Sequence, residues 1–239
     1  MPGPAGEKPR RDLLRRNLLR GVSIFVVTGS LEDDKGAFES DGQAVFETCS
    51  GLGAGVRAHR ASGGDIALTD APGGPDALGG RDAPGGRDES AGPAAPVNQE
   101  VPADSDVPGP AAETNVLVVD GHALFAAAGL DGCLDGAWQA TQAVVNRAFL
   151  AATDKQPVGG RIVYLAPRPG AGPEADAARA GLENLARTLS IEWARYGITV
   201  VTIAPGDSTA PGEAATLAAY LASPAGAYFS GCQLDLRGP

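Results

Sequence analysis

The chain contains few of the residues that build metal and redox sites. Its 239 residues include Cys 3, His 2 and Met 1. The cysteines Cys49, Cys133 and Cys232 lie far apart and form no CxxC pair, and neither histidine stands beside them at metal-binding spacing. We therefore expect no metal site and no disulfide framework, and we expect a reducing, cytoplasmic setting.

Basic residues and long apolar runs are also scarce. Lys+Arg number 19 against Asp+Glu 29, which gives a net charge of −10 and a pI of about 4.6. Nucleic acid and anionic membrane surfaces are themselves negatively charged, so an acidic chain is poorly suited to bind them. No apolar run approaches the ~18 residues of a membrane-spanning helix. We expect neither nucleic acid nor a membrane among the partners.

Aromatic residues make up only 5%, whereas Gly 34 and Pro 19 are high. Much of this glycine and proline falls in residues 71–112, where the six-residue segments GGPDAL, GGRDAP and GGRDES follow one another from Gly73 to Ser90. Such a segment cannot bury enough apolar area to offset its ordering entropy, so we expect a disordered, low-complexity linker. Residues 1–20 form a basic N-terminal extension, which we interpret as a solvated amphipathic helix or a docking segment.

The remaining residues, 21–70 and 113–239, are predicted to build the two parts of one α/β domain. Short apolar runs typical of buried strands stand at 115–119, 160–166, 198–203 and 232–236. Between them, apolar residues recur at helical spacing over 134–152, 176–196 and 214–221. Strands and helices that alternate in this way predict a doubly wound, Rossmann-like parallel sheet.

The segment from Arg179 to Gly206, RAGLENLARTLSIEWARYGITVVTIAPG, resembles the second half of a short-chain dehydrogenase/reductase (SDR), and LASPAGAYFSGCQLDLRG resembles the end of one. The resemblance implies a catalytic tyrosine and lysine assisted by a serine and an asparagine. Here the four positions are held by Ala175 for tyrosine, Arg179 for lysine, Ala166 or Pro167 for serine, and Cys133 for asparagine. Acid–base catalysis contributes about 10²–10⁴-fold, and a methyl group cannot supply it. We expect no catalysis by the chain alone.

The dinucleotide-binding segment of the family is also altered. Residues 21–30 resemble its opening strand, and its glycine loop is then predicted to be split into Thr28-Gly29 and Gly51-x-Gly53 by an insertion, Leu31–Cys49. An alternative register makes 43–48 the first strand. Asp70 would end the second strand and bind the ribose hydroxyls. We interpret Gly29, Gly51, Gly53 and Asp70 as vestigial, expect no cofactor, and expect NAD if one is bound.

Two further features bear on the cofactor and the substrate. The family's Asn-Asn-Ala-Gly segment corresponds to Val119-Asp120-Gly121-His122, which adds a carboxylate near the expected cofactor path. The family's lid after Pro-Gly is reduced to residues 207–213, which is too short to exclude water from a bound substrate.

The resemblance also implies association through two long helices and the last strand. The leading hypothesis is a non-catalytic subunit that pairs with an active SDR homologue, or with itself. Two strips of residues are predicted to form the helix interface: Gly181, Asn184, Thr188 and Ile191 on one helix, and Ala137, Ala140, Val144 and Ala148 on the other. The alternative is an NAD(P)-dependent, ketoreductase-like oxidoreductase with an atypical active site. A third hypothesis is a decaying protein without a partner.

Overall fold

The computed structural model describes residues 18–29, 41–61, 114–150 and 159–237. The predicted linker 71–112, Asp70 and most of the basic extension lie outside these residues. The boundaries predicted between segments therefore stay predictions.

Six parallel strands form one sheet in the order β2-β1-β3-β4-β5-β6. Every residue of β3 is buried, as are the last four of β4, because helices cover both faces of the sheet. The predicted doubly wound, Rossmann-like fold is confirmed. The strands are β1 (Ser23–Gly29), β2 (Gly55–Ala61), β3 (Val116–Asp120), β4 (Gly160–Leu165), β5 (Ile198–Ala204) and β6 (Gln233–Asp235).

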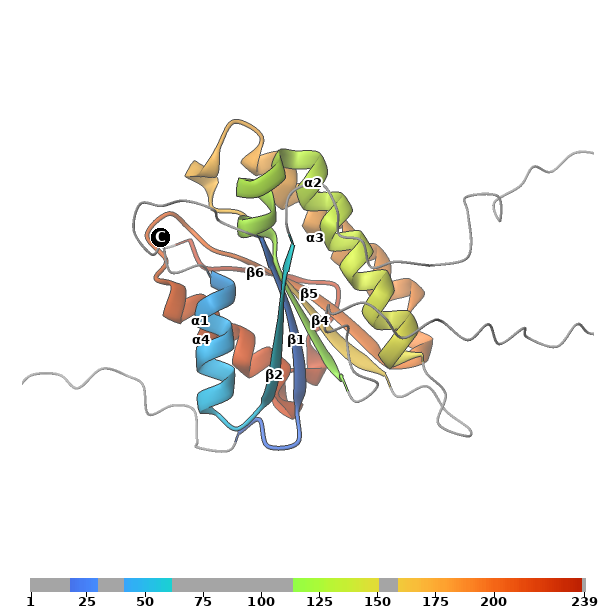
Figure 1. The fold of residues 1–239 in the computed structure, drawn as a ribbon. Coiled ribbons are helices and arrows are strands. Elements are labelled where there is room, and N and C mark those ends of the chain that lie inside the picture. The colour runs from blue at the N-terminus through green and yellow to red at the C-terminus, as the bar shows by residue number, and fades with distance from the viewer. Residues whose placement is uncertain (1–17, 30–40, 62–113, 151–158, 238–239) are drawn as a thin grey trace, which may run out of the picture.

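The helices form a layer on each face of the sheet (Figure 1). On one face lie α1 (Asp41–Gly51) and α4 (Pro211–Ala222), and on the other lie α2 (Gly121–Val144) and α3 (Ala175–Glu192). Successive strand residues point to opposite faces, so Phe25 packs under α2 and α3, whereas Ile24 packs under α1 and α4.

The helix predicted at 134–152 begins earlier than expected. It starts at Gly121, because the Asp120 side chain accepts a hydrogen bond from Ala123 N and caps its first turn. A non-helical break follows at Ala128 and Gly129, and a π-helical turn, Val145–Phe149, continues the helix at its other end. The predicted helix at 176–196 and the short helix before the last strand correspond to α3 and α4.

The opening strand predicted at 21–30 is confirmed as β1, whereas the glycine loop predicted to resume at Gly51 and Gly53 is wrong. Residues 41–51 form α1 and residues 55–61 form β2, so Gly51 and Gly53 end a helix instead of preceding one. The alternative register, a strand at 43–48, is also wrong because these residues lie inside α1. Val45 and Cys49 are buried four residues apart, which is a helical spacing. The predicted insertion Leu31–Cys49 therefore contains most of α1.

Candidate functional site

The candidate site lies at the carboxyl edge of the sheet, beside β1 and β3. From β1 the chain proceeds outward to β2, and it then returns to β3 on the other side of β1, so the strand order reverses here. In doubly wound folds, ligands bind outside the carboxyl ends of the strands at this reversal. The described residues that meet here come from the ends of β1, β3, β4 and β5 and from the start of α1.

Asp120, at the end of β3, is the centre of this region. Its carboxylate is fully buried and accepts hydrogen bonds from Gly42 N at 2.8 Å, Ala123 N at 3.0 Å and Thr28 Oγ1 at 3.4 Å. One carboxylate thus serves the first turns of both α1 and α2. Burial raises the pKa of Asp120, the two backbone N–H groups lower it, and nearby Asp41 raises it further.

Gly42 leaves the space that the Asp120 carboxylate occupies. A Cβ built on residue 42 would lie 2.7 Å from Asp120 Oδ2, closer than real Cβ contacts come. The absence of a side chain at residue 42 therefore lets the carboxylate reach the N-terminus of α1. A helix N-terminus is a ready-made anion site, and here an anion of the chain itself lies against it.

Arg168 ties three segments together across the same edge. Its guanidinium forms a 2.9 Å ion pair with Asp41 at the start of α1 and donates to the carbonyls of Gly206 and Thr209, at 2.9 and 2.6 Å, after β5. The Asp41 side chain is 1% exposed, so this is a largely desolvated pair. Asp41 Oδ2 is buried and has no hydrogen-bond partner among the described residues.

Arg179, which holds the lysine position of the family, is a second buried guanidinium. It donates to the carbonyl of Pro167 after β4 and, at 2.9 Å, to that of Pro205 after β5. Burial lowers its pKa, and the Arg237 charge adds to this lowering. Arg179 therefore cross-links two strand ends. Its contacts are with main-chain acceptors and not with a reacting group.

The other three family positions are also packed into the interior. Ala166 and Ala175 are fully buried, and so is Cys133, whose thiol donates to Gly121 O at 3.3 Å. Burial raises the pKa of Cys133 to about 12, and the nearby Asp120 charge adds to this effect. None of the three presents an ionised group at neutral pH, and the hydrogen bond of the Cys133 thiol is already made to the carbonyl oxygen of Gly121.

The sequence-predicted cofactor residues are not brought together. Gly29 ends β1 at the carboxyl edge, whereas Gly51 and Gly53 precede β2 at the opposite, amino edge. The described part of the second strand reaches Ala61. Asp70 itself lies outside the described residues.

These residues do not fit the dinucleotide that the fold family implies. The Gly42 N–H that a pyrophosphate would use is bonded to Asp120, and the Arg168–Asp41 ion pair joins α1 to the loops beyond β4 and β5. Two buried carboxylates, Asp41 and Asp120, would face a polyanion. A pyrophosphate would have to displace contacts that the chain already makes.

Sequence reasoning placed Thr28 in the glycine loop but missed Asp41, Gly42 and Arg168 as members of this region. A signal was available for the first two. Asp41 and Gly42 directly precede a stretch in which buried residues recur at helical spacing, so they stand at the position of a helix start. Nothing in the local sequence indicated the partner of Arg168, because Asp41 lies far away along the chain.

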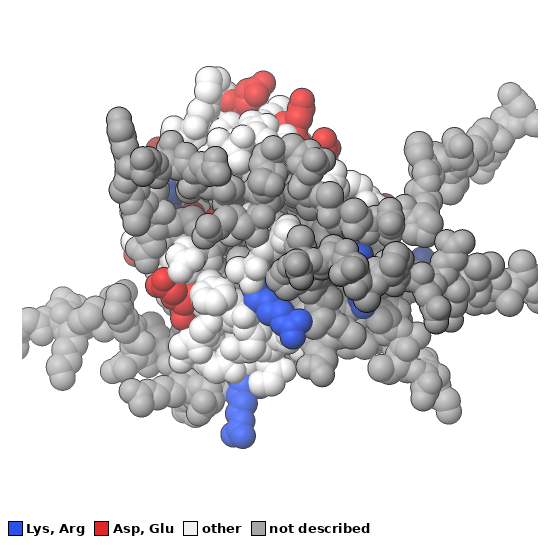
Figure 2. All heavy atoms as spheres, viewed as in Figure 1, with Lys and Arg blue, Asp and Glu red and all other residues white. Residues whose placement is uncertain are grey.

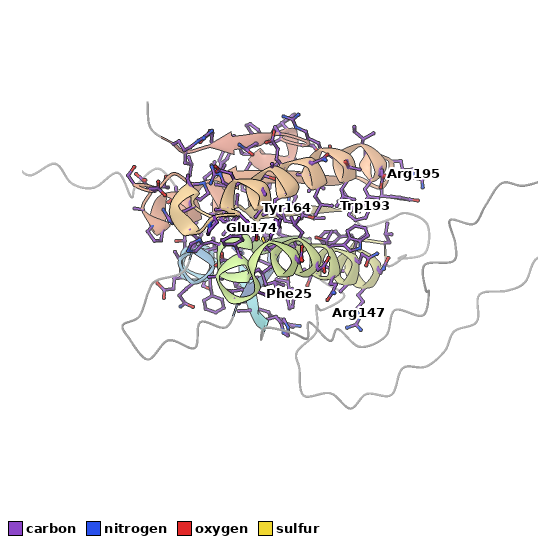
Figure 3. All side chains as sticks on the ribbon, turned by 90° about the horizontal axis from the view of Figure 1, so that it is seen from above. Phe25, Arg147, Tyr164, Glu174, Trp193 and Arg195 are labelled. Carbon is purple, nitrogen blue, oxygen red and sulfur yellow. The ribbon has the colours of Figure 1, made fainter. Side chains whose placement is uncertain are left out.

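The remaining candidate side chains have ordinary structural surroundings. His59 stacks on Phe25, with ring centroids 6.4 Å apart. The hydroxyl of Tyr164 is hydrogen-bonded to Thr141 at 2.8 Å, and Tyr164 projects between α2 and α3 (Figure 3). Among the described residues, no cluster of His, Cys, Asp or Glu is suited to a metal ion, and no helix there is long and apolar enough to cross a membrane.

The backbone is similar to several solved structures. The Pseudomonas aeruginosa citronellol catabolism dehydrogenase AtuB matches with a TM-score of 0.52 and 17% identity over 94% of this chain and 96% of that one. A short-chain dehydrogenase/reductase mutant from Serratia marcescens matches with a TM-score of 0.52 and 17% identity, over 91% of this chain and 96% of that one. BdcA from E. coli matches with a TM-score of 0.51 and 17% identity, over 91% of this chain and 99% of that one. No protein-family model and no curated protein matches the sequence.

Proposed function

We propose that this chain, which has the fold of the short-chain dehydrogenases/reductases, is a non-catalytic, cofactor-free protein that acts by pairing with a catalytic homologue. The observation that carries this proposal is the internal occupation of the carboxyl edge. Asp120 bonds the N-terminus of α1, and Arg168 joins Asp41 to the loops beyond β5. A fold that normally leaves this edge to a ligand fills it here with its own side chains.

The replaced catalytic positions support the absence of catalysis. Arg179 is committed to two main-chain carbonyls, and Ala175 carries only a methyl group. Only residues 207–210 separate Gly206 from α4, which leaves little chain to cover a substrate. A carbonyl oxygen placed here would meet no tyrosine hydroxyl, because Ala175 holds the position of the proton-donating tyrosine.

The pairing surface that we propose differs in part from the sequence prediction. Ala137, Ala140, Val144 and Ala148 are fully buried in the chain's own core, so this strip of α2 is not free to bind a partner. Gly181 is half-buried, and a Cβ there would lie 2.7 Å from Leu134 of α2. Ala140 and Gly181, both predicted to lie in the interface, therefore serve the fold.

The outer face of α3 remains exposed. We call the following exposed residues of this helix the α3 strip: Ala177, Ala180, Asn184, Thr188 and Ile191. Its members recur every three or four residues, and Ile191 is 78% exposed, which is unusual for a large apolar side chain. Small residues along a helix allow a second helix to approach closely, and Ile191 would add apolar contact at the end of the strip. α2 lies alongside α3, with Trp138 stacked on Trp193 between them (Figure 3).

The pairing is tested by co-expressing this chain with the SDR homologue whose gene lies nearest to its own gene in the native host. Light scattering then gives the molar mass of the purified complex. Ile191→Arg should abolish the complex, because an interface of over ~1,200 Å² cannot bury an unpaired charge. Ser50→Arg is the matched control, since Ser50 is exposed on α1 at the opposite face. A chain that stays monomeric with its homologue present contradicts the proposal.

The alternative, an NAD(P)-dependent oxidoreductase, draws support from the fold, since one of the similar structures is that of a dehydrogenase. Calorimetric titration with NADH and NADPH distinguishes the two functions, together with a turnover assay on ketones and β-ketoacyl thioesters. We expect no saturable heat and no turnover. Turnover above the enzyme-free background would establish the alternative.

A further inference from the structure

A pocket opens at the amino edge of the sheet, opposite the region described above. It has a volume of about 710 Å³, within the ~300–1,000 Å³ of small-molecule sites. Its polar lining comes from the starts of several strands. Asn115 precedes β3, Arg161 is in β4, Thr199 is in β5 and Ser230 precedes β6. The pocket is therefore built on the rigid sheet.

Arg161 is the charged residue among the described residues that line this pocket, and no acidic side chain joins it there. The guanidinium is half-buried and donates through Nη1 to Ala222 O at 3.2 Å. The ion pairs within the described part of the chain involve other residues, so no carboxylate there balances Arg161. A partly buried cation without a counter-charge is costly, and an anionic ligand would relieve that cost.

The polar neighbours of Arg161 present hydrogen-bond donors. Asn115 Oδ1 accepts from Ser23 N at 3.0 Å, which leaves its amide NH₂ as a donor. Ser230 Oγ lies 3.4 Å from Val200 N and accepts from it, so its hydroxyl hydrogen is free to point elsewhere. Thr199 adds a second hydroxyl. A pocket lined by one cation and several hydrogen-bond donors matches a ligand group that carries only acceptor oxygens.

The visible charge distribution agrees with this placement. In Figure 2 the acidic side chains lie mainly toward the upper end, where the strands have their carboxyl ends, and prominent basic side chains lie in the lower half. On the face that Figure 2 shows, prominent described basic side chains therefore lie toward the amino edge.

We propose that this pocket binds a small anionic metabolite through a carboxylate or phosphate group seated on Arg161, with Asn115, Thr199 and Ser230 as further donors. The site lies at the opposite edge from the carboxyl ends of the strands, and it borders the end of the α3 strip, since Ser190 and Ala194 also line the pocket. It thus gives the chain a ligand-binding capacity that needs neither a dinucleotide nor a partner.

The test is a thermal-shift and calorimetric titration of the whole chain with inorganic phosphate and with succinate, each against sodium chloride at equal ionic strength. A saturable rise in melting temperature with one of the two anions is expected, and the anion that produces it identifies the group as phosphate or carboxylate. If neither anion gives a saturable effect beyond that of chloride, the proposal is overturned.

Arg161→Gln should weaken the anion's affinity about tenfold or more, because a charged hydrogen bond is lost. Arg57→Gln, at an exposed position of β2, should leave the affinity unchanged. Arg161 also holds Ala222 O, so a variant that fails to fold is replaced by Thr199→Val, which removes one hydroxyl at constant shape. Thr199→Val should weaken binding several-fold with an unchanged melting temperature in the absence of anion. Full affinity in Thr199→Val and in a folded Arg161→Gln would refute the site.

Discussion

The charged groups at the two edges of the sheet differ in how many partners they have within the chain. At the carboxyl edge, Arg168 pairs with Asp41, Asp120 bonds main-chain N–H groups, and Arg179 bonds two carbonyls. At the amino edge, Arg161 has one carbonyl partner and faces a pocket. A fold can thus keep its strand order while the chain itself takes up the interactions that a ligand would make at one edge.

The comparison also bears on how the start of α1 is satisfied in the proposed cofactor-free protein. A dinucleotide needs free N–H groups at the start of α1, and those groups must be satisfied by something when no ligand binds. Asp120 satisfies one of them from inside the protein, and Gly42 leaves the space for it. The edge is then stable without a ligand, so the predictions below perturb its parts in turn.

The largest effect is expected from Arg168→Ala. The change leaves the buried Asp41 carboxylate without its counter-charge and frees the carbonyls of Gly206 and Thr209. Breaking a buried pair from one side costs about 3–5 kcal/mol, which urea unfolding measures directly.

Arg187→Ala is the control for this variant. Arg187 pairs with Glu183 on the surface of α3, and its side chain is 63% exposed. Surface pairs of this kind contribute about 0–1 kcal/mol. Equal losses in the two variants would mean that Arg168 does not hold the carboxyl edge together.

A smaller loss, about 1–3 kcal/mol, is expected from Gly42→Ala, because the added methyl group must push the Asp120 carboxylate away from the N-terminus of α1. Gly51→Ala on the same helix is the matched control. Nothing lies within 4 Å of a Cβ there, so that variant should gain a few tenths to about 1 kcal/mol. Thermal unfolding of both variants gives the comparison, and a Gly42→Ala variant as stable as wild type would show that the carboxylate is not held as described.

Much of the fold was predictable because its signals are local. The buried apolar run before Asp120 specifies β3, and the recurrence of Ala178, Leu182 and Leu189 specifies α3. The structure of the segment around Val45 and Phe46 was not predictable, since a short apolar run fits a strand and a helix equally well. Its assignment to α1 depends on burial against β1 and α4, which are distant in the sequence.

The site and the interface were harder for a related reason. The contacts of Asp120 with Gly42 and Thr28 join residues 78 and 92 positions apart, and no local spacing encodes them. The strip Ala137 to Ala148 was predicted to face a partner because small apolar residues suit both a helix interface and a sheet. In the structure α2 turns that strip inward.

The smallest effect concerns pH and tests the state of Asp120. Burial raises its pKa above the ordinary 3.8, with nearby Asp41 adding to the rise and the Gly42 and Ala123 N–H groups and His122 opposing it. The folded protein therefore binds this proton more tightly than the unfolded chain does. The stability that the protonated group contributes is complete below the ordinary pKa and is lost as pH rises through the folded-state pKa.

Asp120→Asn removes this group, so its unfolding free energy should fall less between acidic and neutral pH than that of wild type. Urea titrations of both proteins at several pH values measure the difference. The exposed Asp131→Asn on α2 serves as the control and should keep the wild-type slope. If Asp120→Asn follows the wild-type pH profile throughout, the buried carboxylate does not change its protonation on folding, and the carboxyl edge is then held by an Asp120 that is ionised in both states.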